Sequence, residues 1–227
     1  MGTHSVEDHL KLTVKDYDVI IRTLVPYYDE LVSTGVEILA QFVTKNALIL
    51  DLGCGTGRLS QAVLKKMPEA HLELLDIDPK ILDQARERFS AENHCIKFKL
   101  GSFFEELPQC DAVLASLSLH HISAMIEKTK VYTNIYSALK PGGLFLCMDV
   151  SVCADDRVSA ESFDQWANHM GKHGIKEETA RRHFAEWKKE EHYHPIHDEL
   201  IALTKAGFAN PECFWRKGPM AIYGALK

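Results

Sequence analysis

The chain has 227 residues, of which 46% are hydrophobic, 26% charged and 9% aromatic, and its formal net charge is −6. This length fits one large α/β domain with a sizeable core, although length alone also permits two small domains. The negative charge argues against a broad nucleic-acid-binding surface, because phosphate contacts are made largely by lysine and arginine; only a local basic patch stays open.

The six cysteines lack the paired C-x-x-C spacing of a zinc site or a redox pair. Several lie in apolar runs, such as 144–148, where a free cysteine behaves as a small buried hydrophobe. The first residues do not resemble a signal peptide, and no run of 18 apolar residues is present. We therefore expect reduced thiols in a cytoplasmic protein without a membrane segment, as a monomer or homodimer.

The first part of the chain is predicted to be helical. Residues 1–12 are expected to form a lid-like leader. Apolar residues then recur at helical intervals from residue 17 to Pro26, and a second helix is predicted over 29–43. The alternation of strands and helices begins after this helical segment.

Residues 49–57 form a buried-strand pattern that runs directly into a glycine-rich turn, and a helix pattern follows over 58–66. Three glycines in five positions allow a close approach of the backbone to a ligand. In an open α/β sheet a ligand sits in the crevice outside the carboxyl ends of the strands. The segment therefore predicts a site for a nucleotide-type cofactor.

The type of cofactor depends on the residues around these glycines. A dinucleotide-binding loop reads G-x-G-x-x-G and holds a pyrophosphate, whereas this loop reads D-x-G-x-G-x-G and begins at Asp51. A carboxylate at this position repels a phosphate and suits a ligand with an ammonium or sulfonium group. Candidate contacts within the loop are Gly53, Cys54 and Gly55.

The second predicted strand ends at Asp76, nineteen positions after Gly57. An acidic residue at about this distance can accept hydrogen bonds from both hydroxyls of a ribose. Asp76 and its neighbour Ile77 are therefore candidate cofactor contacts. Asp78 precedes Pro79 and is expected to cap the next helix.

Five strands of a doubly wound parallel sheet are predicted. They span 47–52, 71–76, 95–100, 110–116 and 143–151. Two helices, over 155–170 and 175–191, are then expected to form an inserted cap. The chain closes with a helix over 196–206, which ends at a glycine suited to the left-handed conformation, and with strands over 208–214 and 221–226.

In this order the motifs resemble those of the class I S-adenosylmethionine-dependent methyltransferases. The matching segments are 51–57, 76–79, 101–103, 110–121 and 139–143. The resemblance covers roughly residues 17–227, and five motifs in order are far more specific than a glycine loop alone. It implies a seven-stranded, mostly parallel Rossmann-like sheet in the order 3-2-1-4-5-7-6, with the last strand antiparallel and helices on both faces.

The resemblance also implies S-adenosylmethionine as methyl donor and S-adenosylhomocysteine as product. We expect one domain over 1–227. Its parts are a helical lid at 1–45, a cofactor-binding core at 46–151, a helical cap at 152–195, and a C-terminal helix with a hairpin at 196–227.

Further cofactor contacts follow from the resemblance. Ser102 stands where relatives commonly have an acidic residue for the adenine amino group, and serine makes a weaker contact. Phe103 is expected to donate its backbone N–H to the adenine ring, although burial in the core explains this phenylalanine equally well. Ser116 is expected beside the methionine part. Arg22 is a candidate partner of the cofactor's carboxylate, and Tyr17 a candidate neighbour, with packing as the alternative.

His121 is the candidate catalytic residue. Its imidazole, with an ordinary pKa near 6.5, is largely neutral at pH 7 and can act as a general base. The alternative is a structural histidine that bonds to the following loop. Tyr27 or Tyr28 is a candidate cover of the entrance.

Two further segments attract attention. The histidines of 192–198 supply enough nitrogen and oxygen for a divalent metal, but their spacing matches no helix face, and we expect no metal site. The run 181–183, flanked by Trp166 and Trp187, is a candidate pocket for a carboxylate-bearing or aromatic substrate; a solvated helix face is the alternative.

The main hypothesis is methyl transfer to a small-molecule nucleophile. The layout is also similar to the carboxy-S-adenosylmethionine synthases of tRNA modification. Those enzymes carry an arginine just before a Lys-Ala-Gly-Phe stretch, where this chain has no arginine in 200–204. A third possibility is a non-catalytic S-adenosylmethionine-binding regulatory protein.

Overall fold

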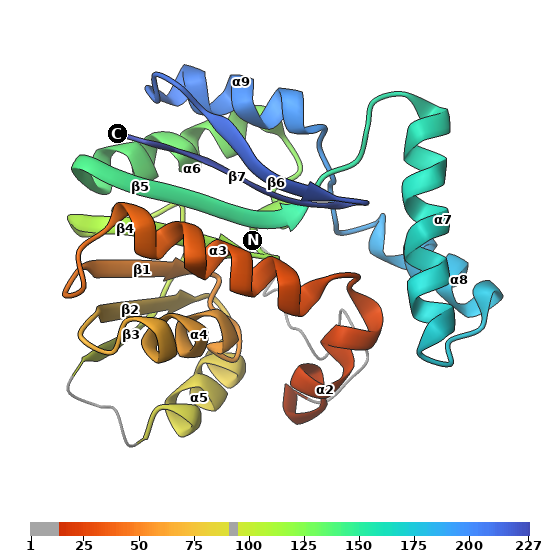
Figure 1. The fold of residues 1–227 in the computed structure, drawn as a ribbon, viewed down its shortest axis with the longest axis horizontal. Coiled ribbons are helices and arrows are strands. Elements are labelled where there is room, and N and C mark those ends of the chain that lie inside the picture. Colours follow the sequence, from red (N-terminus) through yellow and green to blue (C-terminus); the bar gives the residue numbers. More distant parts are fainter. Residues whose placement is uncertain (1–13, 91–94) are drawn as a thin grey trace.

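The computed structural model describes residues 14–90 and 95–227, with the backbone alone for 14–17 and 19. The leader expected at 1–12 lies outside the described residues. A seven-stranded sheet in the order β3-β2-β1-β4-β5-β7-β6 runs through the molecule (Figure 1). The predicted strand order is therefore confirmed.

The sheet is parallel from β3 to β5, and β7 is antiparallel to both of its neighbours, β5 and β6. The strands are β1 (Leu48–Leu52), β2 (His71–Asp76), β3 (Ile96–Leu100), β4 (Cys110–Ser116), β5 (Leu139–Val150), β6 (Glu212–Lys217) and β7 (Met220–Leu226). Because β1, β2 and β4 are parallel neighbours, their carboxyl ends meet at one edge.

Helices cover both faces of the sheet. They are α2 (Val14–Leu24), α3 (Tyr28–Phe42), α4 (Arg58–Lys66), α5 (Pro79–Arg88), α6 (Met125–Ala138), α7 (Asp156–Lys172), α8 (Glu177–Trp187) and α9 (Ile196–Ala206). Alternate residues of β1 serve opposite faces: Ile49 packs with α3, α4 and α5, whereas Leu50 and Leu52 pack with α6 and α9. This alternation is the period of two expected of a strand.

Two predicted strands have wrong bounds: β5 at its start, and β6 at its start and at its end, which is Lys217 instead of 214. β5 begins at Leu139 instead of 143, because Leu139 pairs with Cys110 ahead of an irregularity in the β4–β5 register. β6 begins at Glu212 instead of 208. The reason is that Phe208 does not enter the sheet: its ring packs edge-on against Tyr136 of α6, with the centroids 5.1 Å apart.

The cap of α7 and α8 shares the main hydrophobic core. Trp166 and Met170 of α7, Ala180 and Trp187 are buried in the same cluster as α3. The Trp166 indole N–H donates to the Leu24 carbonyl at 2.5 Å, and a second bond joins His169 to the carbonyl at the end of α2. The cap is therefore fastened to the N-terminal helix. In the described ranges no helix has both the length and the apolar character that a bilayer crossing requires.

A buried polar network joins α6, α9 and β7 beneath the sheet. Lys128 and Glu199, each 1% exposed, form an ion pair. The Tyr132 hydroxyl donates to the other Glu199 oxygen at 2.6 Å and lies 3.2 Å from the Tyr223 hydroxyl. Burial beside Glu199 raises the pKa of Tyr132, so its hydroxyl stays a donor. Each charge in this network depends on its partner.

Lys128→Met is expected to destabilise the protein by about 3–5 kcal/mol, because it leaves the Glu199 carboxylate buried without its cation. The free energy of unfolding from chemical denaturation measures this loss. The double variant Lys128→Met/Glu199→Leu should recover most of the stability. A single variant as stable as the native chain would contradict the assigned role of the pair.

Candidate functional site

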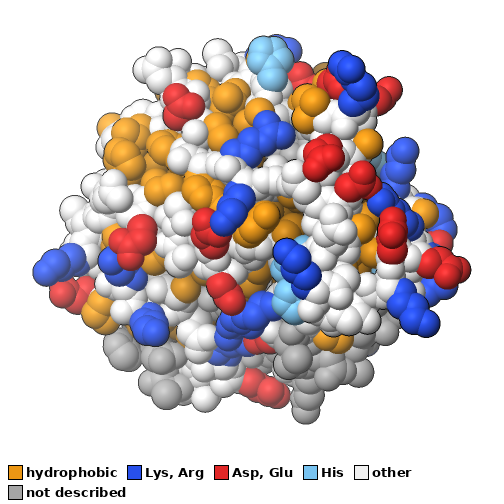
Figure 2. Space-filling view, turned by 45° about the vertical axis from the view of Figure 1, so that its right-hand side comes forward, with side chains coloured by type: hydrophobic (Ala, Val, Ile, Leu, Met, Phe, Trp, Pro, Cys, Tyr) orange, Lys and Arg blue, Asp and Glu red, His pale blue; other side chains and the backbone are white. Residues whose placement is uncertain are grey.

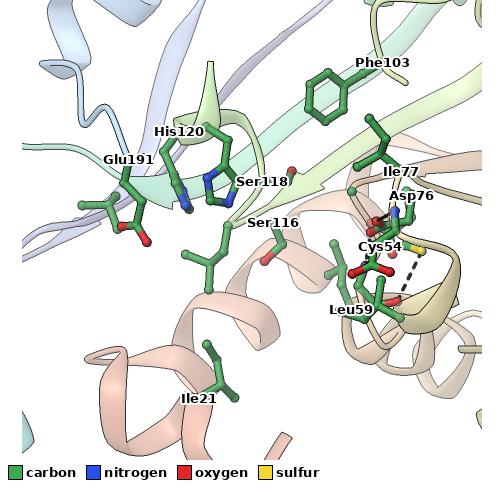
Figure 3. A pocket seen from close by; sticks show the side chains of 18 of the residues that line it. Ile21, Cys54, Leu59, Asp76, Ile77, Phe103, Ser116, Ser118, His120 and Glu191 are labelled. Carbon is green, nitrogen blue, oxygen red and sulfur yellow. Dashed lines mark hydrogen bonds between the residues drawn. The ribbon is translucent and has the colours of Figure 1, made fainter. Parts of the chain in front are cut away.

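A cavity of about 630 Å³ opens at the carboxyl ends of β1, β2 and β4, between α2 and the cap. Ten of the twelve predicted site residues line it. They are Asp51, Gly53, Cys54, Gly55, Asp76, Ile77, Ser102, Phe103, Ser116 and His121. The glycine loop lies at one end, with Asp76 and Cys54, and His120 and Glu191 lie at the other (Figure 3). The cavity therefore has a cofactor end and a second, distinct end.

Close packing explains the glycines at the cofactor end. Gly53 has a φ of 68°, and a Cβ there would lie 2.5 Å from the Cβ of Ser118. Gly57 has a φ of 79°, and its Cβ would meet the Phe89 ring at 2.6 Å. Only glycine fits both the backbone angle and the space at these positions. Packing against Ser118 and Phe89 thus requires glycine at both positions of the loop.

Asp51 and Asp76 are both buried below this loop. Asp51, 1% exposed, accepts a hydrogen bond from Ser60 Oγ at 2.6 Å, and burial raises its pKa to about 6. Asp76 accepts from the backbone N–H groups of Gly55 and Asp78, each at 2.9 Å, and burial raises its pKa too. These raised pKa values mean that the site disfavours uncompensated negative charge. A cationic or hydrogen-bonding ligand would stabilise the two ionised carboxylates.

Asp78 does more than cap α5. Its Oδ1 accepts from the backbone N–H of Lys80 at 2.9 Å, as predicted. Its buried Oδ2 has no hydrogen-bond partner among the described residues, and the side chain lines the cavity. An orphaned carboxylate oxygen of this kind is available to a ligand hydroxyl. Asp76 and Asp78 both belong to the sequence Asp-Ile-Asp-Pro. The position of Asp78 before Pro79 predicted only a helix cap, so its place in the cavity was missed.

The remaining predicted contacts extend this end of the cavity. The Ser102 hydroxyl accepts from the Phe104 N–H at 3.3 Å, so its own proton is free to donate. Phe103 is half-buried and Ile77 is 46% exposed, as expected of side chains that line an open ligand site. The Cys54 thiol is buried, which raises its pKa. It therefore acts as a wall of the cavity instead of a nucleophile.

Arg22 does not reach the cavity. Its Nε donates to both carboxylate oxygens of Asp29 at 2.9 Å, and this pairing turns the guanidinium away. The arginine that lines the cavity is Arg58, the first residue of α4. Its position directly after the glycine loop is the sequence signal that was overlooked. Tyr17 lies on α2, but its side chain falls outside the described residues; Tyr28, not Tyr27, lines the cavity.

The N-terminal helix is attached to the glycine loop. Thr56 Oγ1 donates to Asp18 of α2 at 2.7 Å, and Arg88 of α5 pairs with the same carboxylate. Arg88 also donates to Thr56 Oγ1 at 3.2 Å. This contact holds α2, whose Ile21 and Leu24 line the cavity, against the glycine loop.

At the second end His120, the neighbour of the predicted His121, has a carboxylate partner. Its Nδ1 lies 2.6 Å from Asp149 Oδ1, and both side chains are buried. Burial lowers the pKa of His120, but Asp149 outweighs it, so the net pKa is raised. His121 also lines the cavity, with its ring centroid 4.3 Å from that of His120. Because Asp149 holds Nδ1, the Nε2 of His120 is left for the cavity.

The cap closes this second end with Trp166, Trp187, Glu191 and Tyr193. The two tryptophans agree with the expected pocket under the cap. Arg181 does not line the cavity: it is exposed and pairs with Asp164 and Glu177, as a solvated helix face does. No group of three His, Cys, Asp or Glu side chains that could hold a metal occurs in the described part of the chain, which includes 192–198.

The comparisons with known proteins agree with this geometry. Residues 50–145 match the model of a family described as a methyltransferase domain. A carboxy-S-adenosyl-L-methionine synthase of Campylobacter curvus is 26% identical over 94% of this chain and 92% of its own length.

Two solved structures share the fold. Human N-acetylserotonin methyltransferase, in complex with S-adenosylmethionine, has a TM-score of 0.60 and 21% identity over 99% of this chain and 62% of its own. An O-methyltransferase family protein of Burkholderia thailandensis has a TM-score of 0.64 and 21% identity over 92% of this chain and 57% of its own. This chain thus spans about three fifths of those two. Residues 50–145 thus match a methyltransferase domain, and the described chain has the fold of these two solved methyltransferases.

Proposed function

We propose that this enzyme transfers a methyl group from S-adenosylmethionine to a small-molecule nucleophile at the second end of the cavity. The observation that carries the proposal is the division of one cavity into two ends, with Asp51, Asp76 and Asp78 at the first and the His120 and Asp149 pair at the second. The first end suits a cofactor and the second suits an acceptor.

The residues present fit this cofactor. The buried Asp78 Oδ2, which lacks a partner among the described residues, and the Asp76 carboxylate suit the two hydroxyls of a ribose. Asp51, with its raised pKa, suits a ligand with positive charge. Arg58, which also lines the cavity, is the candidate partner of a carboxylate. Ser102 and Phe103 remain candidates for the adenine.

A small acceptor fits the second end better than a nucleic acid. The cap and α2 enclose this end with apolar and aromatic side chains, as in typical small-molecule sites. On the face shown in Figure 2, lysine and arginine side chains are scattered among acidic ones and do not merge into a basic surface. A strand of phosphates would need such a surface.

His120 is the proposed general base. When bound, S-adenosylmethionine supplies an electrophilic methyl group on a sulfonium. His120 Nε2 can take the proton of the acceptor nucleophile, while Asp149 holds Nδ1 and stabilises the imidazolium that forms. The apolar walls formed by Leu24, Val25 and Val150 exclude water from the acceptor. We assign this role to His120 instead of His121 because Asp149 pairs with His120.

Carboxy-S-adenosylmethionine synthesis is the second candidate, favoured by the relative that matches nearly the whole chain. That reaction needs a cation for the added carboxylate. No residue of α9 lines the cavity, and the segment carries no arginine. Among the described residues, the lysine and arginine that line the cavity come from other elements, Lys130 from α6 and Arg58 from α4. These facts support ordinary methyl transfer.

The decisive experiment incubates the pure full-length chain with S-adenosylmethionine and a pool of small metabolites and analyses the products by mass spectrometry. We expect S-adenosylhomocysteine together with an acceptor that has gained one methyl group. A carboxylated sulfonium product would instead support the synthase. Cofactor binding without turnover would support a regulatory protein, and absence of binding in calorimetry would refute all three.

The affinity for S-adenosylmethionine is expected to rise with pH through the range around the Asp51 pKa of about 6. A cationic ligand favours the ionised carboxylate, so binding releases a proton and is weaker where Asp51 is protonated. Asp51→Asn should flatten this dependence and weaken binding at neutral pH. Calorimetry between about pH 5 and pH 7.5 measures both effects, with Asp83→Asn on the exposed face of α5 as the control. Equal slopes in all three proteins would contradict the role of Asp51.

His120→Ala is expected to lower kcat about 10²- to 10⁴-fold, the usual contribution of a general base, with little change in S-adenosylhomocysteine affinity. In the native enzyme, activity should rise with pH through a pKa above 6.5, because Asp149 raises the pKa of His120. Asp149→Asn should move this midpoint to lower pH and reduce the plateau. Steady-state kinetics across pH give both values. Full activity of His120→Ala, or a larger loss in His121→Ala, would contradict the assignment.

A further inference from the structure

The acceptor end of the cavity has an aromatic wall. The ring centroids of Trp166 and Trp187 lie 5.8 Å apart, as do those of Trp166 and Tyr193, and Tyr193 lies 5.7 Å from His120. The Trp166 N–H is already bonded to the Leu24 carbonyl, so this ring offers the cavity only its carbon surface. Both tryptophans are buried. The wall is therefore a fixed surface next to the proposed base.

The charged side chain that the cap places beside this aromatic wall is the acidic Glu191. Glu191 follows α8 and lines the cavity, and Figure 3 shows its carboxylate beside His120. No lysine or arginine of the described cap lines the cavity; Lys130 and Arg58 come from α6 and α4. The negative charge of Glu191 also helps to raise the pKa of His120. An acceptor with a carboxylate or phosphate would meet repulsion here.

A tyrosine hydroxyl at this end offers a hydrogen-bonding group to a ligand. The hydroxyl oxygen of Tyr193 is buried and has no hydrogen-bond partner in the part of the chain that the structure describes. The Tyr193 ring lines the cavity next to His120. A buried hydroxyl without a partner is costly unless a ligand or water satisfies it. It can accept a hydrogen bond from an N–H group.

We propose that the acceptor is an amine on an aromatic or apolar body, held by Glu191 and the rings of Trp166, Trp187 and Tyr193. This inference rests on the proposed methyltransferase function and names its substrate class. An ammonium group is attracted both by a carboxylate and by the faces of aromatic rings. The hydrocarbon body fits the apolar walls formed by Leu24 and Val150.

The transfer step balances for such an acceptor. The ammonium gives one proton to His120 Nε2, which frees the nitrogen lone pair. The nitrogen then forms a bond to the methyl carbon as the carbon–sulfur bond breaks, and the electron pair of that bond stays on sulfur in a neutral thioether. The methylated nitrogen takes up the positive charge that the sulfonium loses, and the proton on His120 passes to solvent.

Three probes that differ in one group test the inference. Phenethylamine, 2-phenylethanol and phenylacetate share the ring and a short chain but carry an ammonium, a hydroxyl and a carboxylate. Calorimetry with the full-length chain saturated with S-adenosylhomocysteine should show the amine binding at least about 10-fold more tightly than the alcohol, as expected of an ion pair with additional ring contacts. The carboxylate should bind most weakly.

Glu191→Gln should remove most of the difference in affinity between amine and alcohol, because only the ring contacts remain, while the affinity for S-adenosylhomocysteine stays the same. Glu190→Gln is the matched control, because this exposed neighbour does not line the cavity. The preference must survive in the control.

The inference is overturned if the alcohol or the carboxylate binds as tightly as the amine, if none of the probes binds, or if Glu190→Gln has the same effect as Glu191→Gln. Because every titration begins with S-adenosylhomocysteine, the two proposals fail separately. A protein that does not bind this product refutes the methyltransferase function. A protein that binds it without a preference for the amine refutes only the substrate class.

Discussion

The contact between Gly53 and Ser118 fixes the position of both ends of the cavity. Ser118 Oγ donates to the Leu52 carbonyl at 2.8 Å, and its Cβ occupies the space where a side chain at residue 53 would lie. β1 and β4 are parallel neighbours, so the two segments that leave them meet here. One of these segments holds the cofactor end and the other carries Ser116 and His120. The distance between the two ends of the cavity is therefore set by packing. Methyl transfer depends on this distance, because the nucleophile, the methyl carbon and the sulfur must lie in line.

Features specified by short stretches of sequence were predicted correctly. The helix after the glycine loop has the predicted bounds, 58–66, and α9 ends at Gly207, which has a φ of 117°. Asp78 caps α5 as its place before Pro79 indicates. The cofactor end consists largely of residues at the tips of strands, which the sequence reveals as the ends of apolar runs. For this reason ten of the twelve predicted residues line the cavity.

The errors concern choices that depend on distant parts of the chain. His120 and His121 are adjacent and equivalent in sequence; the position of Asp149 on β5 decides which of them this carboxylate contacts. Arg22 has the charge that the cofactor's carboxylate requires, but its guanidinium is already paired with Asp29, which lies across the turn in α3. The early start of β5 likewise depends on its pairing with β4. Periodicity within one segment contains none of this information.

The distribution of charge in the cavity bears on the reaction itself. A sulfonium and an ammonium about 4 Å apart would repel each other by about 4 kcal/mol at the effective dielectric constant of a protein site. Carboxylates lie at both ends of the cavity: Asp51 and Asp76 below the glycine loop, and Glu191 and the Asp149 partner of His120 at the second end. Opposite charge at each end offsets this repulsion when the two reactants bind. After transfer the sulfur is neutral, so the attraction that held the donor is weakened on the product side, and this difference favours release of the thioether.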